Sequence, residues 1–186
     1  MATLFHYSKE YEMERKVLLE SLSICEEIGD QDGIALAYNN LSEVYMVKGD
    51  YEQAICHAEM GLNIGQQIGE EWTIIVSLNN LGEAYFGVGK YQQAMEQLGK
   101  AICLAYQIES IDLVARIAVN MGRVLFNEGN DQKAREWLQA AIQHSAIEYD
   151  HQQIAIQVLK DHQLDPVLEK VDEKLEELVA IFCNAD

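Results

Sequence analysis

Residues 79–94 read NNLGEAYFGVGKYQQA, and this stretch decides the fold because it recurs at a fixed interval. Forty residues earlier, residues 39–54 read NNLSEVYMVKGDYEQA, and forty residues later, residues 119–134 read VNMGRVLFNEGNDQKA. The third copy is weaker, since Asp131 stands where the first two copies have tyrosine. A fixed period in this range, with small and aromatic residues at set offsets, indicates a solenoid of helical hairpins rather than a globular enzyme core.

Each period contains two segments with helical apolar spacing. Leu41, Val44 and Tyr45 lie three and four residues apart, on one face of a helix, and the next two periods repeat the pattern. We therefore expect helices over residues 5–28, 32–47, 51–67, 71–87, 91–107, 111–127 and 131–147. Gly29-Asp30 and Gly69-Glu70 provide a left-handed end and an N-cap between periods, whereas Glu109-Ser110 keeps only the N-cap.

The second period carries a recognisable motif: Leu81, Gly82 and Tyr85, followed by Gly89, Tyr91, Ala94 and Ala101. This motif resembles the helix-turn-helix consensus of the tetratricopeptide repeat, and the resemblance covers roughly residues 1–150. The period of forty and the Asn-Asn-Leu-Gly element are similar to the longer repeats of kinesin light chains, cell-polarity adaptors and bacterial signalling and transcription regulators. The family implies an all-α, right-handed solenoid that binds peptides or protein segments along its concave surface. Ser42 in place of glycine, Asp131 in place of an aromatic residue and Glu14 in place of alanine depart from the consensus.

The repeat also predicts how the chain is divided. We expect a partial repeat over residues 1–29 and full repeats over about 30–69, 70–109 and 110–149, so that the array occupies residues 1–150. The array opens in the middle of a repeat: either a longer parent protein is cut here, or something else covers the exposed flank. Residues 151–186 are predicted to form a degenerate helix and a last helix starting at Asp165-Pro166. The last helix either caps the final hairpin or forms a coiled-coil seam for dimerisation.

Composition limits the class of partner. The formal net charge of −18 repels nucleic acid and anionic lipid surfaces and favours a basic protein partner. The N-terminus lacks the pattern of a signal peptide and no apolar run approaches a membrane-spanning length, so we expect a cytoplasmic protein. Cys25, Cys56, Cys103 and Cys183 are well separated and fall on apolar helical positions, and we expect reduced core thiols.

Catalytic signals are lacking. The five histidines share no metal-ligand spacing with one another or with cysteine, and the sequence contains no phosphate-binding loop or nucleophile elbow. We therefore expect no catalytic residues, no metal and no cofactor.

Binding residues are sought on the first helix of each hairpin, because the family resemblance places that helix along the inner groove. The non-core positions there are Asn39, Asn40, Glu43, Met46, Asn79, Asn80, Glu83, Phe86, Arg116, Asn120, Arg123, Phe126 and Asn127. Asn40, Asn80 and Asn120 recur over three periods, and their amides could hydrogen-bond the backbone of an extended peptide. The alternative is that each asparagine ties its helix to the loop of a neighbour.

Two further groups fall on the same positions. Arg116 and Arg123 form the one basic spot, suited to a single acidic anchor, or else they pair with Glu83 or a neighbouring carboxylate. Uncharged residues precede Arg116 at the matching positions, which disfavours a full carboxylate clamp. Met46, Phe86 and Phe126 share one offset and form either an apolar strip in the groove or contacts between hairpins.

The sequence thus predicts a non-enzymatic interaction module whose concave groove binds a peptide or a helical segment of a partner protein. The alternative is a regulatory or self-association segment of a larger bacterial signalling or transcription-regulator protein. In that alternative, the N-terminal flank or the last helix pairs with a second copy as a homodimer.

Overall fold

The protein is built from helices, as expected. The computed structural model describes residues 2–144, 149–164, 166 and 173–184, and no β-strand occurs among them. The helices are α1 Ala2–Ile28, α2 Gln31–Lys48, α3 Tyr51–Ile68, α4 Glu71–Gly87, α5 Tyr91–Gln107, α6 Ile111–Asn127, α7 Asp131–Gln143, α8 Tyr149–Asp161 and α9 Glu173–Cys183. They form two compact units, Met1–Lys90 (unit 1) and Tyr91–Asp186 (unit 2).

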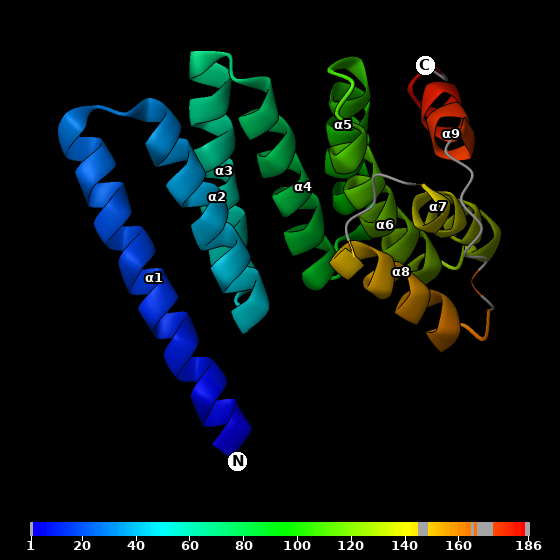
Figure 1. Ribbon diagram of the computed structural model, residues 1–186, viewed down its shortest axis with the longest axis horizontal. Coiled ribbons are helices and arrows are strands. Elements are labelled where there is room, and N and C mark those ends of the chain that lie inside the picture. The colour runs from blue at the N-terminus through cyan, green and yellow to red at the C-terminus, as the bar shows by residue number, and fades with distance from the viewer. Residues whose placement is uncertain (1, 145–148, 165, 167–172, 185–186) are drawn as a thin grey trace. The chain divides into compact units, whose positions relative to one another are not determined.

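Unit 1 contains α1 to α4, and each helix packs against the next (Figure 1). The α2 helix also contacts α4, so these two helices lie side by side although α3 separates them in the chain. Leu22, Ile34, Ala37 and Leu41 form a buried cluster between α1 and α2. The apolar spacing of the sequence therefore produces the packed faces that it predicts.

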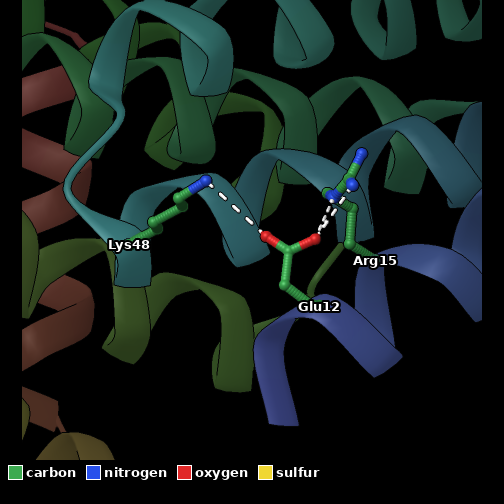
Figure 2. A network of polar contacts seen from close by, with 3 residues as sticks. All are labelled: Glu12, Arg15 and Lys48. Atoms are coloured by element: carbon green, nitrogen blue, oxygen red, sulfur yellow. Dashed lines mark hydrogen bonds and ion pairs between the residues drawn. The ribbon is translucent and has the colours of Figure 1, made fainter. Parts of the chain in front are cut away.

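A polar network also attaches α1 to α2. Glu12 of α1 accepts hydrogen bonds from Arg15 Nε at 3.2 Å and Nη2 at 2.9 Å, and its other oxygen lies 3.8 Å from Lys48 Nζ of α2 (Figure 2). Arg15 chiefly, and Lys48 to a smaller degree, hold the pKa of the Glu12 carboxyl below its ordinary value.

The helix ends follow the predicted capping pattern at two of three junctions. Gly29 and Gly69 are left-handed, and the Asp30 and Glu70 side chains accept hydrogen bonds from the amides of Gly33 and Thr73. At the third junction the expected cap is wrong: Ser110 makes no capping hydrogen bond, because its hydroxyl donates to Asp112 at 2.9 Å. The α7 helix ends at Gln143 rather than at residue 147, and residues 145–148 lie outside the described part, as does the predicted helix start at Asp165.

The departure at Ser42 has a packing explanation. Ser42 is buried and its hydroxyl donates to the Ala54 carbonyl of α3 at 2.8 Å. Gly122 occupies the matching position in α6, where an added Cβ would lie 2.5 Å from Leu138 Cγ and 3.3 Å from the Ala134 carbonyl. The residue that corresponds to Leu138 in the first hairpin is Ala58. A small residue on the second helix thus leaves room for a serine on the first, and a leucine there requires glycine.

Unit 2 contains α5 to α9. The α5 helix packs against α6, α6 against α7, and α8 against α6 and α7, while α9 packs against α5 and α7 (Figure 1). Leu175 and Val179 of α9 are fully buried. The α9 helix therefore covers the second helices of two hairpins, α5 and α7, whereas α8 packs against both helices of the final hairpin.

The thiol prediction is wrong for three of the four cysteines. Cys103 of α5 and Cys183 of α9 form a disulfide with a Cα–Cα distance of 5.6 Å, and Cys56 is exposed rather than in the core. Only Cys25 is a free, half-buried thiol packed against the α1–α2 cluster. Nothing in the sequence indicates the disulfide, since its cysteines are 80 positions apart and only the packing of α9 on α5 brings them together.

Candidate interaction surface

The asparagines at the predicted groove positions differ in accessibility. Asn39, Asn79, Asn80 and Asn120 are buried, and Asn40 is half-buried. Asn40, Asn80 and Asn120 therefore do not present equally accessible amides. Asn120 also belongs to unit 2, whereas the other two belong to unit 1.

Two of the buried asparagines join α4 to α2. Asn80 Nδ2 donates to the Asn39 carbonyl at 3.3 Å, and the Ser77 hydroxyl donates to Asn39 Oδ1 at 2.8 Å. The α3 helix approaches the same point, because a Cβ added at Gly61 would lie 2.7 Å from Asn39 Oδ1. The sequence left open that each asparagine ties its helix to a neighbouring loop. In unit 1, Asn80 instead ties its helix to another helix. We call this contact of Asn39, Ser77 and Asn80 the polar seam.

The accessible groove positions of unit 1 lie on α2 and α4, which pack together. Glu43 is exposed, and Asn40, Met46, Glu83 and Phe86 are half-buried. Glu43 and Glu83 are separated by one period, as are Met46 and Phe86, so each pair occupies corresponding positions on the two helices. The α2–α4 face, defined by these five residues, therefore combines carboxylates, apolar side chains and an amide.

The groove positions of unit 2 lie on α6. Arg123 Nη1 donates to Asn120 Oδ1 at 2.9 Å, and the exposed Asn127 donates to the Arg123 carbonyl at 2.9 Å. Phe126 is buried and stacks on His162, with ring centroids 3.9 Å apart. Phe126 is thus covered by a residue that follows α8, and it does not line an open strip with Met46 and Phe86.

Arg116 has the least satisfied environment of these residues. It is half-buried, and its Nε and Nη2 atoms are buried and have no hydrogen-bond partner among the residues that the structure describes. A buried guanidinium favours a carboxylate, because charge-assisted hydrogen bonds compensate the loss of water.

The structure contains a cavity that the sequence does not predict. It has a volume of about 560 Å³ and is lined by residues of α7 and by the chain that follows α8: Asp131, Gln132, Arg135, Glu136, His162 and Leu164. The lining mixes acidic and basic side chains, so its charge selects no single ligand class. No repeat position marks His162 or Leu164, since both lie beyond the periodic part of the sequence.

The described residues offer neither a metal site nor a membrane-spanning helix. They contain no group of three or more histidine, cysteine or acidic side chains that could hold a metal ion. No helix among them combines the length and the apolar character needed to cross a membrane.

The sequence and the structure both resemble known repeat proteins. The description Tetratricopeptide repeat applies to the two family profiles that match, one over residues 33–106 and the other over residues 115–143. A comparison with curated proteins finds no match.

Two solved structures share the fold. BtubC (BKLC) from P. vanneervenii is 16% identical with a TM-score of 0.67, and the match covers 99% of this chain and 77% of that one. A kinesin light chain from Podospora anserina with nearly identical TPR-like repeats is 16% identical with a TM-score of 0.62, and the match covers 97% of this chain and 90% of that one. The repeated helix pairs, the matched profiles and these structures agree, and the chain belongs to the tetratricopeptide repeat family.

Proposed function

We propose that the chain is a non-enzymatic binding module whose α2–α4 face holds a basic peptide or helical segment of a partner protein. Tetratricopeptide repeats generally mediate protein–protein interaction, and the family is typically non-enzymatic. The observation that carries the proposal is the accessible Glu43–Glu83 pair beside Met46 and Phe86 on two packed helices.

The chemistry of this face favours a cationic ligand with an apolar side chain. Glu43 and Glu83 supply negative charge within a chain of net charge −18, which steers a basic partner toward the surface. Met46 and Phe86 offer partly exposed apolar surface, and a flexible thioether adapts to different side chains. Asn40 can donate and accept hydrogen bonds with a peptide backbone.

The remaining predicted positions have different roles in this proposal. The polar seam positions α2 and α4 and does not contact the ligand. Arg116 belongs to unit 2 and is not part of this face. We expect the protein to act in the cytoplasm. We also expect it to bind neither nucleic acid nor anionic membranes, because its net negative charge repels both.

Charge reversal tests the proposal. Peptides are first selected from a random library by the wild-type chain, and binding is then measured by fluorescence polarisation. Glu43→Lys with Glu83→Lys should weaken binding at least about tenfold, which corresponds to about 1.4 kcal/mol.

The matched control carries the same charge change at exposed positions on other helices, Glu26→Lys with Glu59→Lys. Equal losses in the two double variants would mean that only the overall charge attracts the ligand. An unchanged affinity of the Glu43/Glu83 variant would likewise overturn the proposed face.

A second candidate function is self-association, and a specific feature of α1 favours it. Met13, Val17, Ile24 and Ile28 are 65%, 61%, 58% and 71% exposed. They follow one another at spacings of four, seven and four residues, so they lie on one face of α1, turned away from Leu22 and the α2 contact. We call them the α1 stripe.

The α1 stripe is self-complementary, because its spacing reads the same from both ends. Two copies paired in antiparallel fashion would place Met13 opposite Ile28 and Val17 opposite Ile24. Such pairing has the two-fold symmetry of most homodimers, in which both subunits use the same patch. This geometry favours a second copy over an unrelated partner.

Analytical ultracentrifugation over a range of concentrations tests the dimer. The wild-type chain should dimerise, and Val17→Glu with Ile24→Glu should abolish dimerisation, since each glutamate would be buried opposite the other. Val47→Glu, at a 65% exposed position of α2, should leave the dimer intact. A wild-type chain that stays monomeric at every concentration would rule out this second function.

A further inference from the structure

The described part of α9, Glu173–Cys183, packs on the rest of unit 2. Leu175 and Val179 are fully buried, and the Phe182 ring meets Trp137 of α7 edge to face with centroids 5.8 Å apart. These contacts occupy one side of α9 and hold it on α5 and α7.

The covalent bond lies at the end of this contact. Cys183 is the last residue of α9, and its partner Cys103 lies on α5. The bond closes a segment of the chain 80 residues long, and without it the docking of α9 would have to hold that segment together by packing alone. The bond therefore adds a covalent link to the packing of Leu175, Val179 and Phe182.

The disulfide lies near the surface of unit 2. Cys103 and Cys183 are half-buried rather than fully buried, and exposure of a disulfide is one factor that governs its reduction by a thiolate. Phe182, beside Cys183, is 38% exposed, so the end of α9 lies at the surface.

We propose that the Cys103–Cys183 disulfide is a reversible redox site that controls whether α9 covers α5 and α7. One thiolate of a dithiol reductant attacks one cysteine sulfur, which breaks the protein disulfide and forms a mixed disulfide. The second thiol of the reductant then attacks the mixed disulfide, releases the remaining protein cysteine as a thiol and leaves the reductant as an intramolecular disulfide. The protein disulfide accepts two electrons and two protons and becomes two thiols. The α9 helix then leaves its site and uncovers Trp137, which is only 6% exposed when α9 is docked.

The uncovered surface has a definite character. Trp137 and the backbone at Gly99, where an added Cβ would meet the Phe182 ring at 3.4 Å, lie beneath α9. Exposed tryptophan beside a small residue forms an apolar surface, the kind that binds hydrophobic dyes or an apolar segment of another protein. Reduction therefore changes what the α5–α7 side of unit 2 can bind.

The test uses the chain of residues 1–186 with Cys25→Ser, Cys56→Ser and Trp72→Phe, which leaves one cysteine pair and one tryptophan. Thiol titration should find no free thiol after oxidation and two after treatment with dithiothreitol. On reduction, Trp137 emission should shift to the red and the amides of residues 173–184 should exchange hydrogen severalfold faster.

The matched control adds Cys103→Ser and Cys183→Ser to the same chain. It should resemble the reduced chain, with or without dithiothreitol. Two free thiols after oxidation would overturn the proposal, because the bond would not form. Identical Trp137 emission and α9 exchange in the oxidised and reduced chains would also overturn it, because α9 would stay docked without the bond.

Discussion

A four-variant cycle at Gly122 and Leu138 tests the packing rule that distinguishes the two hairpins. Gly122→Ser introduces a Cβ atom 2.5 Å from Leu138 Cγ, so the leucine must move or the two helices must separate. Leu138→Ala removes the obstacle and recreates the combination of Ser42 and Ala58 in the first hairpin. The two substitutions should therefore compensate each other.

The magnitudes follow from the contacts. Overpacking by Gly122→Ser should cost about 1–3 kcal/mol, and the better helix propensity of serine should offset only about 0.5 kcal/mol. Leu138→Ala alone should cost about 2–5 kcal/mol, because Leu138 is fully buried. In the double variant the serine hydroxyl can donate to the Ala134 carbonyl, as Ser42 donates to Ala54. The double variant should be more stable than the sum of the single losses predicts by about 1–3 kcal/mol.

Urea unfolding monitored by circular dichroism gives the four free energies. The reverse cycle in the first hairpin, Ser42→Gly and Ala58→Leu, is the matched control and should show the same sign of coupling. If the losses add to within about 0.5 kcal/mol, the two sites are independent and the packing rule is wrong.

Two further predictions concern unit 1. Gly61→Ala should lower the free energy of unfolding by about 1–3 kcal/mol in the same urea assay, because the new Cβ would lie 2.7 Å from Asn39 Oδ1; a stability gain would show that the polar seam tolerates it. In an NMR titration the Glu12 pKa should lie below the ordinary glutamate value and rise more with Arg15→Ala than with Lys48→Ala, and a larger effect of Lys48 would contradict this order. Since folding lowers this pKa, the contribution of Glu12 to stability is present above the unfolded-state pKa and is lost as pH falls through the folded-state value.

The repeated elements of the fold were predictable because each rests on local spacing. The period predicted the helices to within a few residues, and glycine followed by an acidic residue predicted the ends at Gly29 and Gly69. Ser110 occupies an N-cap position, but the nearby Asp112 competes for its hydroxyl, and sequence spacing does not reveal which contact wins.

Contacts between distant segments were harder to predict. The bond between Cys103 and Cys183 depends on where α9 docks, which no repeat specifies. The cover of His162 over Phe126 likewise comes from the chain beyond the periodic region. Periodicity identified the positions on the first helices of the hairpins, but burial divided them into buried residues such as Asn80 and accessible ones such as Glu43. Which accessible positions bind a partner stays a prediction.

The polar seam limits how amino-acid substitutions can alter the packing of α2 against α4. If α2 slid along α4 by one helical turn, the Ser77 hydroxyl and the Asn80 amide would lose their acceptors on Asn39 inside a buried contact. The seam therefore locks the relative register of the two helices independently of the surface residues. Substitutions at Glu43, Glu83 or Phe86 should then leave the spacing between these positions unchanged.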